Sequence, residues 1–161
     1  MSGRMTKRSK NIKNILIKSS GDVAESRRFI SFVRRKARNN YVVVVCGGGT
    51  KISEAFQKAG HPIRFDEIHG RITETWEERK LARDILEQEE QNLQDAFVGR
   101  GVVVMAPIIY AGSVLYHING DNLVKLLAPS FDEAYVFTTT NRRDKKVEQF
   151  RDYPKIQVIG I

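Results

Sequence analysis

Three short segments of this chain place charged or very small residues directly after an expected β-strand, where open α/β sheets hold their ligands. The first is Lys18-Ser19-Ser20-Gly21, which follows an apolar stretch. A lysine at the end of a buried strand, with backbone N–H groups freed by serine and glycine, can hold an anion over the loop. A plain turn whose lysine reaches out to solvent would account for the same residues.

The second segment is a run of three glycines, Gly47 to Gly49, followed by Thr50. Glycine permits positive φ and lets a phosphate approach the backbone N–H groups at the start of a helix. The spacing matches neither the G-x-G-x-x-G pattern of dinucleotide-binding proteins nor the G-x-x-x-x-G-K-[ST] pattern of Walker loops. Because a tight turn needs a single glycine, the run favours an anion site over a plain turn.

The third segment, Asn119-Gly120-Asp121, precedes apolar residues at helical spacing. Asn119-Gly120 is a good turn signal, and Asp121 is a good helix N-cap, which would explain it without a catalytic role. A catalytic role requires the carboxylate to lie near Lys18, which the order of the residues does not show. Both roles of Asp121 therefore stay open.

Few other residues of the chain suggest chemistry. Cys46 is the single cysteine, which excludes an internal disulfide and favours a reducing compartment, so that we expect a cytoplasmic protein. Its position at the end of a buried strand predicts an inert thiol. The three histidines show no ligand spacing, so no metal site is expected.

Hydrophobic patterning predicts the elements that carry these segments. Apolar runs without alternation predict buried strands over 14–18, 41–46, 102–106, 133–138 and 156–161. Helical spacing predicts helices over 24–38 and 52–59, a long helix capped by Thr73, and a short one opened by Asp121, with residues 107–120 irregular or hairpin-like. Strands separated by helices predict a three-layer α/β/α sandwich with a mainly parallel sheet.

The long charged helix is expected to be amphipathic. Its predicted inner side holds Trp76, Leu81, Ile85 and Leu86, and its predicted solvent side holds Glu77, Glu78, Glu87, Glu89 and Glu90.

Positive charge is concentrated near the N-terminus. Of the formal net charge of +8, residues 1–40 carry +10, from twelve Lys or Arg and two acidic residues, which leaves −2 for residues 41–161. Such a segment is typical of a nucleic-acid-binding protein. It is equally typical of a protein with a cationic tail and one exposed basic helix. The second interpretation is favoured, because no aromatic residues are interleaved with the basic ones as a stacking platform for bases requires. Residues 1–13 are predicted to be a disordered basic arm and residues 14–161 a single domain.

Composition excludes two further classes. Hydrophobic residues make up 41% of the chain, enough for a sizeable core, so global disorder is excluded. The longest uncharged apolar run, Tyr41 to Cys46, is too short to cross a bilayer, and the basic N-terminus lacks the apolar stretch of a secretory signal, so no membrane partner is expected.

Taken in chain order, the three segments resemble the amino-acid kinase superfamily, which includes the acetylglutamate, uridylate, aspartate and carbamate kinases. The opening I-L-I-K-S-S-G-D-V is similar to the start of uridylate kinases, and V-V-V-V-C-G-G-G-T is similar to the second-strand signature. Gly70-Arg71-Ile72-Thr73 resembles the L-R-V-T of acetylglutamate kinases, and I-N-G-D-N-L resembles the step before a short helix. Thr138-Thr139-Thr140 with Asp144-Lys145 resembles a degraded T-x-V-D-G-V-x-D-K loop.

The resemblance, over residues 12–161, implies a carbamate kinase-like fold, a homo-oligomer and ATP-dependent phosphoryl transfer, with magnesium, to an acidic or phosphate-bearing small molecule. It implies that Lys18 stabilises the transferring phosphoryl group and that Asp121 orients Lys18. It assigns phosphate or nucleotide binding to Ser20, Gly21, Gly47, Gly48, Gly49, Thr140 and Asp144. Arg71 would pair with the acceptor, since a planar guanidinium suits a carboxylate, and Asn119 would line the acceptor side.

The chain also departs from the family pattern. Asn141-Arg142-Arg143 stands where the family has V-D-G. The family also has a C-terminal nucleotide-binding lobe with a second lysine; the resemblance does not include much of this lobe, and nothing after Lys155 matches that lysine. Arg142, Arg143, Lys145 and Lys146 either replace part of that charge or form a solvated charge run. A small-molecule kinase is the leading hypothesis; the alternatives are a non-catalytic ligand-binding or regulatory protein and a nucleic-acid-associated basic protein.

Overall fold

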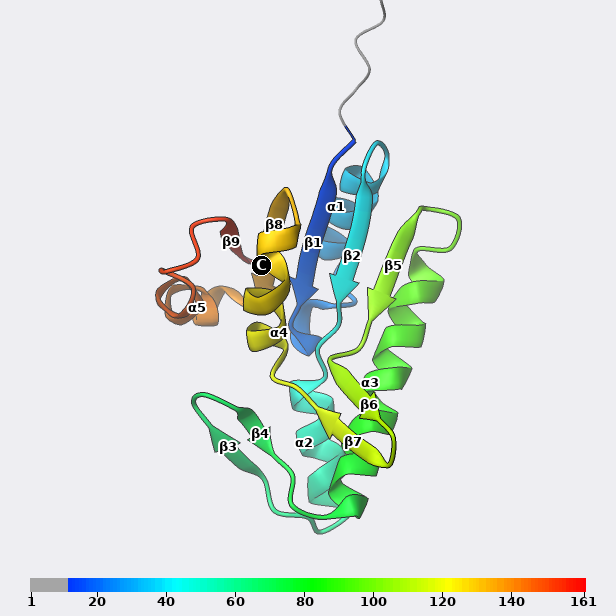
Figure 1. The fold of residues 1–161 in the computed structure, drawn as a ribbon, viewed down its shortest axis with the longest axis vertical. Coiled ribbons are helices and arrows are strands. Elements are labelled where there is room, and N and C mark those ends of the chain that lie inside the picture. The colour runs from blue at the N-terminus through cyan, green and yellow to red at the C-terminus, as the bar shows by residue number, and fades with distance from the viewer. Residues whose placement is uncertain (1–11) are drawn as a thin grey trace, which may run out of the picture.

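A five-stranded parallel sheet forms the centre of the protein, in a computed structural model that describes residues 12–161 (Figure 1). The strand order is β5-β2-β1-β8-β9. These strands are β1 (Asn14–Ser19), β2 (Tyr41–Val45), β5 (Val102–Met105), β8 (Glu133–Thr138) and β9 (Ile156–Gly160). All five predicted strands are confirmed, and each pairs in parallel with its neighbours, as expected of apolar runs without alternation.

Helices cover both faces of the sheet, so the chain forms three layers (Figure 1). The helices are α1 (Arg27–Ala37), α2 (Gly49–Lys58), α3 (Trp76–Ala96), α4 (Gly120–Leu127) and α5 (Arg143–Gln149), with 3₁₀ turns η1 (Gly21–Val23), η2 (Ala128–Ser130) and η3 (Thr140–Arg142). On β1, Ile15 and Ile17 are buried with side chains of α1 and α3, and Leu16 is buried with side chains of α4. The predicted α/β architecture is thereby confirmed.

Two hairpins lie beyond the ends to which the strands point, together with α2 and the start of α3 (Figure 1). Strand β3 (Arg64–Asp66) pairs antiparallel with β4 (Gly70–Ile72), and β6 (Ile108–Ala111) pairs antiparallel with β7 (Val114–His117). The second hairpin agrees with the hairpin-like character expected of residues 107–120. The sequence did not predict the first, because its three-residue strands are too short to show a pattern.

The long helix begins later than the sequence indicates. Its N-cap is Thr75, whose hydroxyl accepts the N–H of Glu78 at 3.1 Å, while the Glu78 carboxylate accepts the N–H of Thr75. The prediction of Thr73 as the cap is therefore wrong, and Thr73 is buried. The prediction that Trp76 lies on the inner side is also wrong, since it is 47% exposed.

Two glutamates of α3 that were expected to face solvent are buried. Glu78 turns inward because it completes the helix cap and lies 3.6 Å from the Arg64 guanidinium. Glu89 turns inward because Lys51 of α2 reaches its carboxylate at 2.6 Å. The partner of Glu89 comes from another helix, which helical spacing does not reveal, whereas the cap of Glu78 is local and lies in the T-x-x-E pattern of residues 75–78.

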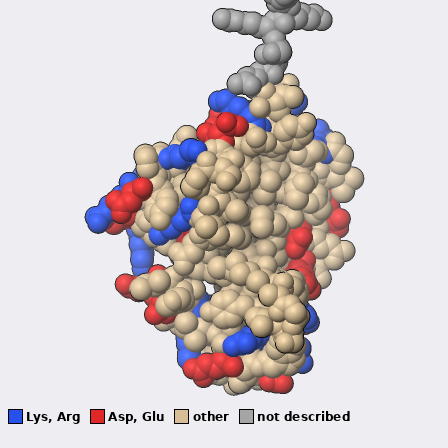
Figure 2. All heavy atoms as spheres, viewed as in Figure 1, with Lys and Arg blue, Asp and Glu red and all other residues tan. Residues whose placement is uncertain are grey.

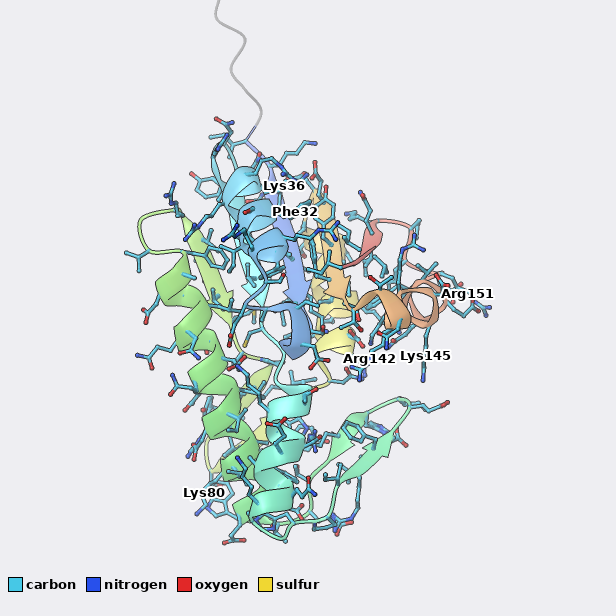
Figure 3. All side chains as sticks on the ribbon, turned by 180° about the vertical axis from the view of Figure 1, so that it is seen from behind. Phe32, Lys36, Lys80, Arg142, Lys145 and Arg151 are labelled. Carbon is cyan, nitrogen blue, oxygen red and sulfur yellow. The ribbon has the colours of Figure 1, made fainter. Side chains whose placement is uncertain are left out.

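Some of the basic residues near the N-terminus bond to other parts of the protein, whereas Arg27, Arg28 and Arg38 are exposed. Of the predicted arm over residues 1–13, positions 1–11 lie outside the described residues, whereas Lys13 forms an ion pair of 2.6 Å with Glu133. On α1, Lys36 bonds to Glu133 at 2.6 Å and lies over Phe32 (Figure 3). Across residues 12–161, no helix combines the length and the apolar character that a membrane span requires.

Candidate functional site

Lys18 and Asp121 meet at the carboxyl end of the sheet. Lys18 is the fifth residue of β1 and Asp121 lies in the first turn of α4, and the Lys18 ammonium lies 3.1 Å from the Asp121 carboxylate. Both side chains are largely buried, with 9% and 7% of their surface exposed. Asp121 also bonds to the ammonium of Lys146 on α5, so one carboxylate serves two cations.

The backbone around Asp121 explains why its carboxylate can reach the two lysines. The N-cap of α4 is Asn119, whose side chain accepts the N–H of Asp121 at 3.0 Å, so the prediction of Asp121 as the cap is wrong, as is that of an Asn119-Gly120 turn. Freed from capping, the Asp121 side chain is available to the lysines. Gly120 leaves room for one of them, because a Cβ at this position would lie 2.9 Å from Cε of Lys18.

The two lysines determine the charge state of Asp121. Burial by itself would raise the pKa of this carboxyl, but the charges of Lys18 and Lys146 lower it to about 2. Burial also lowers the pKa of Lys146, in spite of the carboxylate beside it. At neutral pH Asp121 is therefore an anion that holds two ammonium groups in place.

The loops that follow β1 and β2 touch through their glycines. A Cβ on Gly21 would lie 2.9 Å from the carbonyl oxygen of Gly47, and a Cβ on Gly47 would lie 2.7 Å from that of Ser19. None of Gly47, Gly48 and Gly49 has a positive φ, so the conformational freedom that the glycine run suggested is not used. Close backbone packing, which a side chain would prevent, accounts for Gly21 and Gly47.

The rest of the glycine run forms the start of α2, earlier than the predicted start at Ile52. Gly48 is its N-cap and makes no side-chain cap bond, and a Cβ there would touch Leu86 at 3.3 Å. Gly49 is exposed, with no atom within 4 Å of a Cβ position. The N-terminus of a ten-residue helix, with its partial positive charge, is thus open beside the Lys18 loop.

The β3–β4 hairpin brings Arg71 and Asn119 to the same place. Gly70, at φ 78°, packs so closely on Asn119 that a Cβ would lie 3.1 Å from the Asn119 side chain. The amide of Asn122 donates to the Ile68 carbonyl at 2.6 Å and ties the hairpin to α4. Arg71 then donates to the Gly49 carbonyl at 2.8 Å, which joins the hairpin to the glycine run.

The Arg71 guanidinium is buried with unused donors. It lies between the rings of Phe56 and Phe65, 5.1 and 4.6 Å from their centroids, and burial lowers its pKa. Its Nη1 has no hydrogen-bond partner among residues 12–161, and neither do the Thr73 hydroxyl and the two ring nitrogens of His117. Each of the three residues is at most 8% exposed. These buried polar atoms mark a place that suits an anionic group.

The remaining predicted site residues lie apart from this cluster or at its edge. Ser20 belongs to the Lys18 loop and donates its N–H to the Phe137 carbonyl at 3.0 Å. Thr140 is exposed, and its N–H bonds to the carbonyl of Ile161, the residue after β9. The Asp144 side chain is 95% exposed and lies 3.2 Å from Arg143, so it does not turn toward Asp121.

Comparison with protein-family models gave no match, and neither did comparison with curated proteins. One region is surrounded by residues of β1, η1, β4, the loop from β2 into α2, and the start of α4. These residues are Lys18, Gly21, the glycine run, Arg71, Asn119 and Asp121. The arrangement can hold an oxyanion at Lys18 and a second anionic group at Arg71.

Three residues of this region could not be singled out from the sequence. Lys146 belongs to a run of charged residues whose members look alike before folding. Asp22 accepts the Thr50 hydroxyl at 2.6 Å and lies 3.2 Å from the Arg142 guanidinium, which connects the Lys18 loop to both α2 and η3. Neither contact has a signal in residue spacing.

Proposed function

We propose that this protein is a small-molecule kinase, with a carbamate kinase-like fold, that transfers a phosphoryl group from ATP to an acidic or phosphate-bearing acceptor. One observation carries the proposal. Lys18 and Asp121, far apart in the chain, form a buried pair of 3.1 Å at the end of β1, and the loop that follows Lys18 packs on Gly47 after β2. This is the pairing that the resemblance to the amino-acid kinase superfamily implies.

In this proposal Lys18 neutralises charge on the transferring group. Phosphoryl transfer depends mostly on position and electrostatics, which a fixed ammonium and a helix N-terminus supply. Asp121, with a pKa of about 2, is too weak a base to take a proton at neutral pH and acts by orienting Lys18. In this proposal the N–H groups of Gly21 and Gly49, at the starts of η1 and α2, donate to phosphate oxygens.

Arg71 and Asn119 would bind the acceptor. The guanidinium is fixed by two aromatic rings and by bonds to Gly49 and Ser53, and its free Nη1 suits a carboxylate or a phosphate. Among residues 12–161 no group of three His, Cys, Asp or Glu side chains gathers as a metal site would require. In this proposal magnesium is held chiefly by the phosphates of ATP, as is common for this ion.

A ligand-binding or regulatory protein without catalysis is the second candidate. The observation that favours it is the exposure of Thr140 and Asp144, the residues that the resemblance assigns to the nucleotide. Binding of an acceptor without binding of ATP would identify this function.

Titration calorimetry with ATP–magnesium, UMP and acetylglutamate, followed by an ADP-release assay, tests the proposal. We expect Lys18→Met to lower turnover by about 10²–10³-fold, since one donor to the transferring group is lost. Lys58→Met, on the exposed end of α2, is the control and should leave turnover unchanged. Absence of ATP binding, or equal turnover of Lys18→Met and the unaltered protein, would refute the kinase.

A further inference from the structure

The segment after β8 carries four cations within five residues, and folding separates them. Lys146 bonds to Asp121 of α4, and Arg142 lies 3.2 Å from Asp22 in the loop after β1. Arg143, in contrast, pairs with its neighbour Asp144 and packs its stem against Gly160. Two of the four cations are thus attached to the site, through carboxylates that come from other elements.

The topology explains why these two cations reach the site. β1 and β8 are adjacent parallel strands, with Ser19 opposite Phe137, so the turns that follow them, η1 and η3, leave the sheet side by side. Arg142 ends η3 and is the N-cap of α5, and Lys146 lies four residues later, about one turn into that helix. The junction of η3 and α5 therefore presents both cations to the region of Lys18, where Asp22 and Asp121 hold them.

The three cations lie at decreasing depths below the surface. Side-chain exposure rises from 9% for Lys18 to 21% for Lys146 and 59% for Arg142. The surface is hollowed between α5 and the β3–β4 hairpin, with Lys or Arg atoms at the margin of the hollow (Figure 2). Arg142 and Lys145 lie on the side of η3 and α5 that faces this hairpin (Figure 3). An anion bound at Lys18 would lie near Lys146, which shares the Asp121 carboxylate with Lys18, and Arg142 lies farther toward the surface.

Charge and donors remain for such an anion. Lys18, Lys146 and Arg142 carry three positive charges against the two negative charges of Asp22 and Asp121. An ammonium has three N–H groups, and within the described residues Lys146 donates to Asp121 and Gln149. A guanidinium has five, and Arg142 uses Nη1 toward Asp22. The cations are held in position and keep donors for a ligand.

We propose that Lys18, Lys146 and Arg142 form a single binding site for an oligophosphate chain of two or more phosphate groups. The inference rests on the proposed function, in that it places one phosphate at Lys18. It goes further by assigning the remaining phosphates to η3 and α5. The chain belongs either to a nucleoside triphosphate or to an inorganic oligophosphate, which share this chemistry.

Titration calorimetry of the full chain with orthophosphate, pyrophosphate, triphosphate and ATP–magnesium at constant ionic strength tests the inference. We expect triphosphate to bind at least about tenfold more tightly than orthophosphate, because a charged hydrogen bond is worth a factor of this size. Equal affinity for triphosphate and ATP indicates the phosphate chain alone, and a preference for ATP indicates further contacts to the nucleoside. Orthophosphate and triphosphate of equal affinity would overturn the inference.

Matched variants locate the site. Arg142→Ala and Lys146→Met should each weaken triphosphate binding about tenfold or more. Arg151→Ala removes an arginine of similar exposure that pairs with Glu148 at the outer end of α5, and Lys80→Met removes a lysine of α3 far from it; both should stay within about twofold (Figure 3). Circular dichroism and thermal unfolding confirm that each variant folds.

The outcomes separate the two proposals. If triphosphate binds and Lys18→Met abolishes binding while Arg142→Ala and Lys146→Met do not affect it, the inference is wrong and the proposed function stands. If the Arg151 and Lys80 variants weaken binding as much as the other two, general surface charge explains the binding and the inference is again wrong. If no phosphate compound binds, the proposed function itself fails.

Discussion

The Asp121 carboxylate lies 3.1 Å from the Lys18 ammonium, with both side chains less than a tenth exposed. Lys146 bonds to the same carboxylate. Removing the carboxylate therefore leaves two cations without the anion that compensates their burial. We expect Asp121→Asn to lower the free energy of unfolding at neutral pH by about 3 kcal/mol or more. Urea unfolding measures this free energy. Asp144→Asn, at an exposed site, is the control and should change stability by less than about 0.5 kcal/mol.

The ion pair of Asp121 and Lys18 predicts that the stability of the protein decreases at acidic pH. The folded pKa of Asp121 is about 2, below the ordinary 3.8, so the folded protein holds fewer protons on this group than the unfolded chain does. Its contribution is complete above about pH 4 to 5 and is lost as the pH falls through 3.8 toward 2. Asp121→Asn should remove this part of the acid sensitivity. A variant with the acid profile of the unaltered protein would contradict the assignment.

Two glycines of the same run should respond in opposite ways to alanine. Gly47→Ala places a methyl group 2.7 Å from the Ser19 carbonyl oxygen, so we expect a loss of about 1–3 kcal/mol of stability. Gly49→Ala meets no atom within 4 Å and replaces a helical glycine, so we expect a gain of up to about 1 kcal/mol. Chemical unfolding of both variants decides the matter. Equal effects would show that the loops after β1 and β2 do not pack as described.

His117 should make the protein less stable in mild acid. Burial, with the charges of Arg71 and Arg79 nearby, lowers the pKa of this imidazole below 6.5. As the pH falls, His117 is protonated in the unfolded chain before it is protonated in the folded protein. The free energy of unfolding therefore decreases as the pH drops through 6.5. His117→Gln should flatten the stability profile between pH 7 and pH 5. An unchanged slope in thermal unfolding across this range would argue against a buried, neutral imidazole.

Thr73 and Thr75 should differ although they lie close together in the chain. Thr75→Ala removes the cap of α3 and should cost about 1 kcal/mol. Thr73→Val replaces a buried hydroxyl that has no partner within residues 12–161, so stability should stay the same or rise. Thermal unfolding distinguishes them. If Thr73→Val proved the more damaging change, the hydroxyl would have a partner within the fold.

The strands of the sheet could be predicted because each is marked by a short continuous stretch of the sequence. Continuous apolar runs such as Tyr41 to Cys46 mark strands covered on both faces, and Cys46 is indeed buried, which raises the pKa of its thiol to about 12. The loops after these strands could be named for the same reason, since parallel strands bring their carboxyl ends to one edge. Lys18 and the glycine run followed from this rule.

The completed site needed the tertiary structure. Nothing in residue spacing distinguishes Lys146 from Lys145, or Glu89 from the exposed glutamates of α3, because each is selected by a partner from a distant element. Asp22 and Arg142 meet because β1 and β8 are neighbours, which depends on strand order. The sequence by itself determined which residues could carry charge and where strands end. Packing decided which cations share a carboxylate. The reason is that burying a charge costs free energy unless an opposite charge lies beside it.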